Sequence, residues 1–223
     1  MPMGSKKPGD KPKSIKKNNR SLLLNILRNR TRATVSEMAD ITSLSSTTIL
    51  KILNYLVSQG VVREAGKRNS TSDGGRRPLI FEYNADFGYV ISIHILEHRI
   101  LLAVTDAASR IQRFMEHPIQ KNLELDHVTS IISSYIDETL GSEPEIREKC
   151  LGIAIAGAGM VNQAEGLVIT ASHFPSWGTN ANLVERIRTE TGVDLPIFLE
   201  NYSRFRAYAE YTIGVARDAN VVV

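Results

Sequence analysis

The sequence has almost no cysteine, the residue that cross-links small proteins and binds structural metals in many others. It contains a single cysteine, Cys150, in 223 residues. No disulfide can therefore form within the chain, and a reducing, cytoplasmic environment is expected. One thiol without partners also argues against a structural zinc site. We therefore expect no metal and no cofactor.

Long hydrophobic runs are missing as well. No apolar stretch reaches the roughly 18 residues that a membrane-spanning helix needs. No apolar segment precedes Ser21, so no secretory signal is expected. Hydrophobic residues still make up 42% of the chain and charged residues 23%, which is typical of a globular protein with a packed core.

Acidic residues are scarce in the first third of the chain. Residues 1–83 contain 16 Lys and Arg against 6 Asp and Glu, a net charge of +10, whereas residues 84–223 contain 11 against 18, a net charge of −7; together they give +3. A basic first part joined to an acidic remainder predicts a polyanion-binding module fused to a domain of another kind. Chance drift of charge along the chain is the alternative.

Residues 1–19 also lack apolar side chains almost entirely and are rich in Lys, Pro and Gly. Such a composition cannot offset the entropy of ordering the backbone, so it predicts a disordered basic arm. From Arg20 the pattern changes, because leucine and isoleucine recur at helical spacing. This predicts a first helix over residues 20–29.

Local capping signals predict two further helices and a hairpin. Thr34 and Glu37 form the pattern of a capping box before a short second helix. Ser45 is suited to cap a third helix, which ends before Gly60. Val61 and Val62 begin a strand whose partner is residues 79–83. Three helices followed by a two-stranded hairpin predict a winged helix-turn-helix over residues 20–83.

The third predicted helix has two contrasting faces. At about 100° per residue, Ile49, Ile52, Leu53, Leu56 and Val57 fall on one arc. The opposite face carries only hydrogen-bond donors, and residues 43–58 include no acid. Such a face suits entry into the DNA major groove, with an ordinary solvated face as the alternative. The predicted DNA contacts are Ser45, Thr47, Thr48, Lys51, Asn54 and Ser58 from this helix, and Lys67, Arg68, Arg76 and Arg77 from the wing.

The wing arginines have a second interpretation. Arg76 and Arg77 precede Pro78 and could instead form a structural hinge at the domain junction. A wing contact and a hinge are compatible, because a basic loop can both join two domains and lie along a phosphate backbone.

The remainder, residues 84–223, alternates between strand and helix patterns. Three consecutive strands are followed by a helix, a buried strand, a hairpin, a helix, a strand and a final helix. This order predicts an α/β sandwich with a mixed sheet. The strands are expected over residues 89–96, 99–106, 112–119, 151–156 and 196–200, and the helices over residues 126–140, 181–191 and 203–213.

Three segments resemble the ROK family of repressors, open reading frames and sugar kinases. They are GGRRPLIFEYNADFGYVISIHI, LGIAIAGAGMVN and FLENYSRFRAYAEY. The similarity runs from about Asn18 to the last residue and is greatest to the branch of xylose and N-acetylglucosamine regulators. It implies that residues 84–223 form the first lobe of an actin-like ATPase fold and that the chain ends within the ROK domain. It also implies a sugar or sugar-phosphate effector.

The departures from the kinase pattern concern its catalytic positions. Family kinases open with a GIDIGGT-like phosphate loop, but here His94 replaces the Asp, and Leu96 and Glu97 replace glycines. The Asp that is the general base of the family's END-like motif is replaced by Tyr202. We therefore expect no catalytic residue and no enzyme activity. His94 is expected to be a core histidine with its hydrogen bonds satisfied.

The resemblance also implies candidate sugar contacts, namely Gly157, Gly159 and Asn201. A tight turn and an asparagine at a strand end are the structural alternative. The family's zinc motif and second-lobe sugar clamp lie beyond these residues, so effector binding by this chain is expected to be weak.

Taken together, these patterns predict a sequence-specific transcriptional regulator. We expect a repressor of carbohydrate-metabolism genes that binds double-stranded DNA as a homodimer and carries a non-catalytic sensor domain. The alternatives are a ROK-type sugar kinase with an appended DNA-binding domain, or a truncated remnant with only DNA-binding or dimerisation ability.

Overall fold

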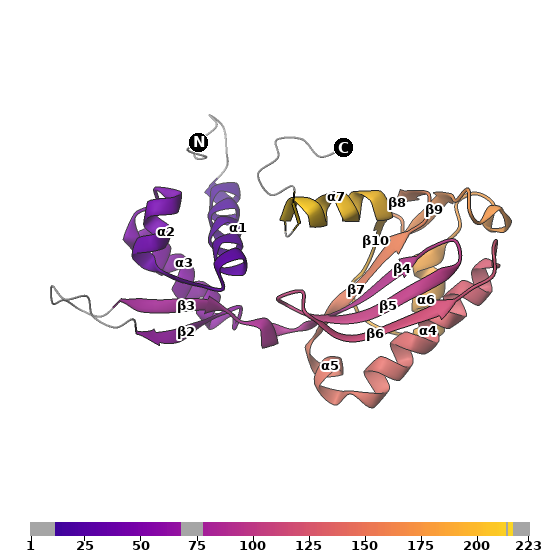
Figure 1. The fold of residues 1–223 in the computed structure, drawn as a ribbon, viewed down its shortest axis with the longest axis horizontal. Coiled ribbons are helices and arrows are strands. Elements are labelled where there is room, and N and C mark those ends of the chain that lie inside the picture. The colour runs from indigo at the N-terminus through magenta and orange to yellow at the C-terminus, as the bar shows by residue number, and fades with distance from the viewer. Residues whose placement is uncertain (1–11, 68–77, 213, 216–223) are drawn as a thin grey trace. The chain divides into compact units, whose positions relative to one another are not determined.

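The computed structural model describes residues 12–67, 78–212 and 214–215. The chain divides into two compact units, residues 1–87 and 88–223, close to the Asn84 boundary that the sequence suggested (Figure 1). In the described part of the chain, no helix is both long enough and apolar enough to cross a membrane.

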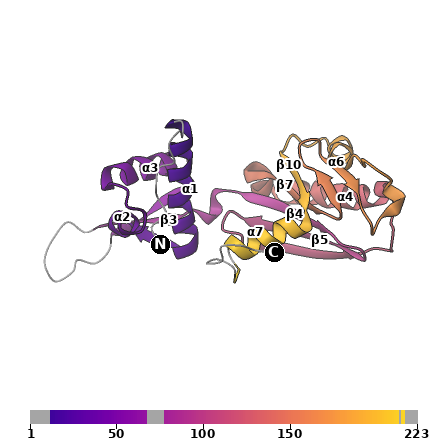
Figure 2. The same ribbon diagram turned by 90° about the horizontal axis from the view of Figure 1, so that it is seen from above.

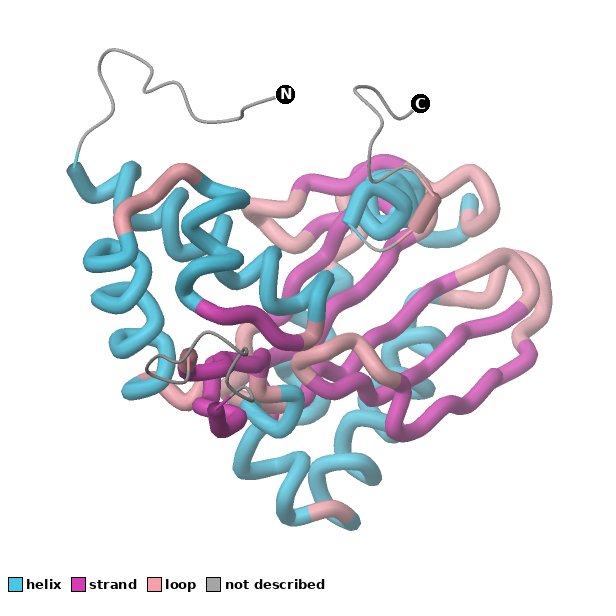
Figure 3. Tube along the Cα trace, turned by 60° about the vertical axis from the view of Figure 1, so that its left-hand side comes forward, coloured by secondary structure: helices cyan, strands magenta, loops and turns pink. Residues whose placement is uncertain are grey.

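In the first unit, three helices pack on a small antiparallel sheet with strand order β1-β3-β2. Figure 3 distinguishes these helices (cyan) from the strands (magenta). The core contains Leu23, Leu27, Met38, Leu53 and Phe81, which are completely buried. The elements are α1 (Pro12–Arg30), β1 (Arg32–Thr34), α2 (Val35–Thr42), α3 (Ser46–Ser58), β2 (Val62–Lys67), β3 (Leu79–Tyr83) and the 3-10 turn η1 (Ala85–Phe87).

The first helix is longer than predicted, so the prediction of a disordered arm is wrong for residues 12–19. Pro12 occupies the first helical position, where a missing N–H costs nothing. Ile15 lies on the same helical line as Ile26, three turns later, and is half-buried. The rest of the predicted arm, residues 1–11, lies outside the described residues.

The sheet has three strands, and the predicted two-stranded hairpin is therefore incomplete. The unpredicted strand β1 pairs with β3, which places Arg32 opposite Glu82, while β2 places Arg63 on the other side of it. The Glu82 carboxylate accepts hydrogen bonds from Arg63 Nε at 2.5 Å and from Arg32 Nε at 2.9 Å. The Arg63 hydrogen bond, supported by the positive charges of both arginines, holds the pKa of Glu82 below its usual value.

The second unit is built on a five-stranded mixed sheet, which confirms the predicted α/β class. The strand order is β10-β7-β4-β5-β6; β7 runs parallel to both β4 and β10, and the other pairs are antiparallel. Helices α4 and α6 lie together against one face of the sheet (Figure 2). Its elements are β4 (Tyr89–Ile95), β5 (Arg99–Asp106), β6 (Ile111–Pro118), α4 (Leu125–Ser142), α5 (Pro144–Lys149), β7 (Cys150–Gly157), β8 (Met160–Asn162), β9 (Leu167–Thr170), η2 (Pro175–Trp177), α6 (Leu183–Thr191), β10 (Ile197–Asn201) and α7 (Tyr202–Thr212).

Alternation along the strands decides which side chains enter this core. Ile91, Ile93 and Ile95 of β4 are buried, and so are Ile153 and Ile155 of β7. They pack with apolar residues of α4 and α6. The strand residues between them face the other side of the sheet and are half-buried or exposed.

Candidate nucleic-acid interface and second-unit pocket

Side-chain caps fix the ends of α2 and α3. Thr34 Oγ1 accepts from the Glu37 backbone, and the Glu37 carboxylate accepts from the Thr34 N–H at 2.8 Å, which confirms the predicted capping box. Ser43 adopts the left-handed conformation (φ 58°) and ends α2. Ser45 then caps α3, because its hydroxyl accepts from the Thr48 N–H at 3.2 Å.

Helix α3 divides into a buried face and an exposed face, as its sequence predicted. Ile49, Leu53 and Leu56 are buried, and Ile52 and Val57 pack partly buried beside them. The exposed residues of the opposite face are Thr47, Lys51, Asn54 and Ser58. We call these four residues the α3 stripe.

Only some side chains of the α3 stripe already form hydrogen bonds within the protein. The Thr47 hydroxyl lies 3.0 Å from Ser45 Oγ, and the Ser58 hydroxyl donates to the Tyr55 carbonyl oxygen at 2.8 Å. Lys51 and Asn54 make no side-chain hydrogen bond or ion pair with any other described residue. Their donors are therefore available to an external acceptor.

The predicted wing contacts cannot be placed in the same way. Lys67 is the last residue of β2, and its side chain lies outside the described part. Arg68, Arg76 and Arg77 also lie outside the described residues. Their role in binding DNA stays a prediction.

Two residues beside the α3 stripe were not predicted. The Arg20 guanidinium carbon lies 3.7 Å from the centre of the Tyr55 ring, which is within the range of a cation–π contact. Tyr55 is 40% exposed, and it follows Lys51 by one helical turn. The helical wheel places Tyr55 at the edge of the stripe, but the sequence gives no sign that Arg20 from α1 would reach it.

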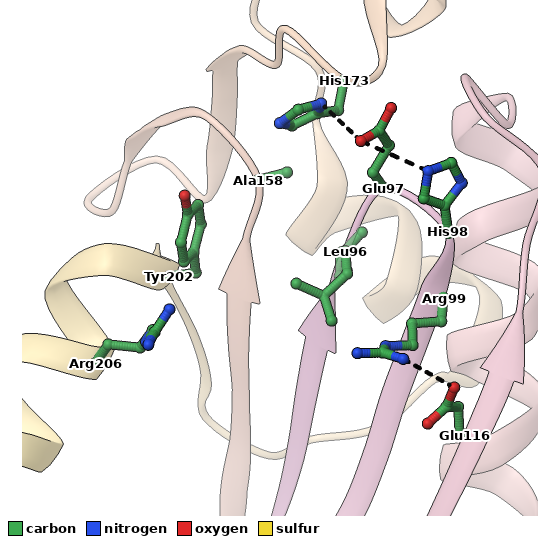
Figure 4. Close-up of a pocket in the computed structure, with 10 residues that line it drawn as sticks. Leu96, Glu97, His98, Arg99, Glu116, Ala158, His173, Tyr202 and Arg206 are labelled. Atoms are coloured by element: carbon green, nitrogen blue, oxygen red, sulfur yellow. Dashed lines mark hydrogen bonds and ion pairs between the residues drawn. The ribbon is translucent and has the colours of Figure 1, made fainter.

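In the second unit, a cavity of about 590 Å³ opens between the β4–β5 turn and the start of α7 (Figure 4). Two arginines, Arg99 and Arg206, line it, and so does Tyr202. The full lining is Ile95, Leu96, Glu97, His98, Arg99, Glu116, Ala158, His173, Tyr202 and Arg206.

Most charged groups around this cavity are already paired. Glu97 lies between the rings of His98 and His173 in Figure 4, with nitrogen–oxygen distances of 3.7 and 3.5 Å, and Lys121 Nζ lies 3.2 Å away. The Lys121 hydrogen bond holds the pKa of the Glu97 carboxyl below its usual value. Arg99 pairs with Glu116 at 3.4 Å.

His94 departs from the expectation of a satisfied core histidine. Its Nε2 is buried and has no hydrogen-bond partner among the described residues. Its ring stacks on Tyr202, with centroids 5.9 Å apart. Burial, reinforced by the charges of Arg206 and Arg99, lowers the pKa of His94 and favours the neutral imidazole. The strand position was predicted correctly, but packing against the α7 tyrosine could not be seen from the strand alone.

The structure brings the three candidate sugar contacts together. Asn201 of β10 pairs in register with Gly157 of β7, and its Nδ2 donates to the Gly159 carbonyl oxygen. Its Oδ1 accepts from the Ser203 N–H at 2.8 Å. Gly159 has a φ of +87°, and a Cβ there would lie 2.1 Å from the Thr170 carbonyl oxygen. These contacts give the residues a structural role, and sugar binding by them stays a prediction.

These features describe a two-part protein, with a three-helix unit that exposes hydrogen-bond donors and a larger α/β unit with a mixed sheet. The chain belongs to the ROK family, whose model matches residues 90–223.

The chain is similar to several named repressors. It is 29% identical over 212 residues to the xylose repressor of Bacillus spizizenii, covering 94% of this chain and 52% of that protein. It is 22% identical over 187 residues to the N-acetylglucosamine repressor of Escherichia coli O157:H7, covering 82% and 43%. The chain thus spans about half the length of these relatives.

A solved structure shows the same fold. It is described as a ROK family transcriptional regulator, a homologue of the E. coli MLC protein, and matches with a TM-score of 0.69 at 20% identity. The match covers 92% of this chain and 50% of that one, so it includes residues of both units.

Proposed function

We propose that the protein is a sequence-specific DNA-binding repressor of carbohydrate-metabolism genes. The first unit would be a winged helix-turn-helix over residues 20–83, and residues 84–223 would be the first lobe of a non-catalytic, actin-like sensor domain. The similarity to named xylose and N-acetylglucosamine repressors supports this assignment, because it spans most of the chain.

The main support for DNA binding by the first unit is the α3 stripe. It presents donors without a neighbouring carboxylate, on a helix whose other face is locked into the core. The caps at Thr34 and Ser45 fix the starts of α2 and α3. A helix held in this way would suit insertion of the stripe into a major groove. Lys51 and Asn54 would contact base edges, and the hydroxyls of Ser45, Thr47, Thr48 and Ser58 would contact phosphates.

The second unit would sense a sugar or sugar phosphate without transforming it. Leu96 and Glu97 occupy the β4–β5 turn, where a carboxylate would repel phosphate groups. Tyr202 packs on His94 and offers no carboxylate as a general base. These residues favour a regulator over the kinase alternative. Gly157, Gly159 and Asn201 remain the proposed first-lobe contacts to the sugar.

Two copies of the protein would act together on DNA. Helix-turn-helix dimers bind half-sites about 34 Å apart, one turn of the double helix, so the operator should contain an inverted repeat. The wing residues Lys67, Arg68, Arg76 and Arg77 would add contacts to the backbone or the minor groove.

The test is a fluorescence anisotropy titration of the full chain against the intergenic DNA upstream of its own gene. It is run at two salt concentrations, with unlabelled random DNA as competitor. Binding that survives an excess of competitor is expected, because base contacts discriminate between sequences whereas phosphate contacts do not.

Weak, steeply salt-dependent binding that the competitor abolishes would contradict sequence-specific recognition. It would reduce the first unit to a basic surface that binds any polyanion. In a coupled assay with ATP, phosphorylation of xylose or N-acetylglucosamine by the same preparation would contradict the non-catalytic assignment.

A further inference from the structure

The first turns of α1 carry a cluster of positive charge outside the α3 stripe. Lys16, Lys17 and Arg20 lie on one face of the helix, since their positions differ by no more than about 100° around its axis. Together with Ser21, Leu24 and Leu56 they line a shallow cavity of about 350 Å³. The cavity therefore has an apolar floor and a cationic rim.

The described cations of the first unit differ in whether a carboxylate neutralises them. Arg32 and Arg63 are bound to Glu82, where they hold the sheet together. Lys16 and Lys17 are exposed, and no carboxylate of the described residues lies within 4.0 Å of either. Like charges held close together without counter-charges repel one another, so this cluster gains most from a polyanionic partner.

Tyr55 links this cluster to the α3 stripe. Arg20 stacks on the Tyr55 ring at 3.7 Å, which holds its charge beside a residue one helical turn from Lys51. The Arg20 guanidinium makes no hydrogen bond or ion pair with another described residue, so its N–H groups are available to an external acceptor. Those groups suit a phosphate, which arginine can bind through two parallel hydrogen bonds.

We infer that the first turns of α1 form a second DNA-contact site, specific for backbone phosphates, in which Tyr55 positions Arg20. A helix lying in the major groove has a phosphate backbone on each side of it. Arg20 would bind the backbone next to α3, and Lys16 and Lys17 would follow the same strand. This inference rests on the proposed DNA-binding function.

The experiment measures binding of the full chain to a fluorescein-labelled duplex of mixed sequence, about 30 base pairs long or roughly three helical turns, over a series of salt concentrations. Loss of one phosphate contact should flatten the slope of log K against log salt by about 0.9. We expect this for Arg20→Ala, with affinity reduced roughly three- to tenfold near physiological salt. Arg20→Gln should behave alike while keeping much of the side chain.

A matched control and two tyrosine variants define the role of each residue. Arg28→Ala removes one charge from the exposed last turn of the same helix and should leave the slope almost unchanged. Tyr55→Leu should lower affinity as Arg20→Ala does, whereas Tyr55→Phe keeps the ring and should bind normally. Because Tyr55 acts through Arg20, Tyr55→Leu should have no further effect in an Arg20→Ala background.

Each contrary result has a distinct meaning. Equal effects of Arg20→Ala and Arg28→Ala would show that only net charge matters and would overturn the inference. A normal slope for both Arg20→Ala and Arg20→Gln, with operator binding still weakened by Lys51→Ala, would overturn the α1 site and leave the α3 interface standing. A wild-type chain that binds no DNA would overturn both proposals.

Discussion

The two units handle their polar side chains in opposite ways. In the first unit, Lys51 and Asn54 are exposed and make no side-chain bond within the described residues. In the second unit, the Glu97 carboxylate lies within 4 Å of the Lys121 ammonium and of two histidine rings, and both polar atoms of the Asn201 side chain are hydrogen-bonded. Lys51 and Asn54 of the first unit thus offer free donors, whereas Glu97 and Asn201 of the second unit already have partners inside the unit.

This difference has an energetic consequence for ligand binding. A free donor on the surface exchanges only water for its ligand, while a bonded one must first give up an internal hydrogen bond, worth about 0.5–1.5 kcal/mol. The α3 stripe is therefore ready to bind without rearrangement. A ligand that binds to Asn201 must either leave its two internal hydrogen bonds in place or compete with them.

The largest expected effect on binding comes from removing three side chains of the α3 stripe. Thr47→Ala, Lys51→Ala and Asn54→Ala together should weaken operator binding by roughly 2–6 kcal/mol, since Lys51 and Asn54 each supply a base contact worth about 1–3 kcal/mol. Anisotropy with operator DNA measures the loss, and circular dichroism checks that the fold is intact. An unchanged affinity would mean that the free donors of α3 do not contact the operator.

The next effect tests whether the hydrogen-bonded residues of the second unit are structural. Gly159→Ala places a Cβ 2.1 Å from the Thr170 carbonyl oxygen and forces an alanine to a φ of +87°. We expect a loss of roughly 3 kcal/mol in unfolding free energy, measured by urea denaturation. Gly192→Ala is the matched control, because its φ is +65° but no atom lies within 4 Å of the added Cβ. Equal losses in the two variants would mean that the close contact at Gly159 is relieved easily.

A third effect concerns the charges that the first unit does use internally. Glu82→Gln should cost about 1–2 kcal/mol in unfolding free energy near neutral pH, because two charge-assisted hydrogen bonds weaken. The arginines are more than half exposed, which keeps the effect modest. Glu64→Gln, on the exposed surface of β2, is the control.

The pH dependence of Glu82 has a definite sign. Its pKa is lowered in the folded state, so its stabilising contribution is present above the ordinary value of 4.5 and is lost as the pH falls below that value. Denaturation curves of the wild type should show this loss in acid, and those of Glu82→Gln should show less of it. Parallel pH profiles for the two proteins would argue against the lowered pKa.

The smallest effect concerns His94 in the second unit. Its folded pKa is lowered, so its contribution to stability is complete above the ordinary value of 6.5 and declines as the pH falls below it. The slope cannot exceed about 1.4 kcal/mol per pH unit, the limit for one proton. His94→Phe should flatten this part of the profile in calorimetry, and an unchanged profile would contradict the lowered pKa.

Local chemistry made much of the first unit predictable from its sequence. The Thr34–Glu37 box and the Ser45 cap act over three residues, and the two faces of α3 follow from helical periodicity alone. Strand β1 was missed because three residues are too few to show an alternating pattern and because their partners in β3 lie far along the chain. The Arg20–Tyr55 contact was missed for the same reason, since it joins two separate helices.

In the second unit, the sequence indicated the succession of strands and helices along the chain. It did not indicate how side chains pack at the edge of the sheet. The order of the strand and helix patterns predicted a mixed sheet, and every second residue of β4 from Ile91 to Ile95 is buried. The stacking of His94 on Tyr202 and the bonding of Asn201 to Gly159 depend on how β10 and α7 return to the sheet. A single sequence does not encode those distances in any local pattern.

Thr34 serves two elements at once, and this has a mechanical consequence for the first unit. It is the last residue of β1, opposite Ile80, and also the N-cap of α2. Deleting one residue from β1 would turn Ala33 away from the core. The same deletion would also remove the Thr34 cap from α2. Thr34 thus joins the small sheet to α2, so a change in the register of β1 against β3 would also disturb the start of the helix.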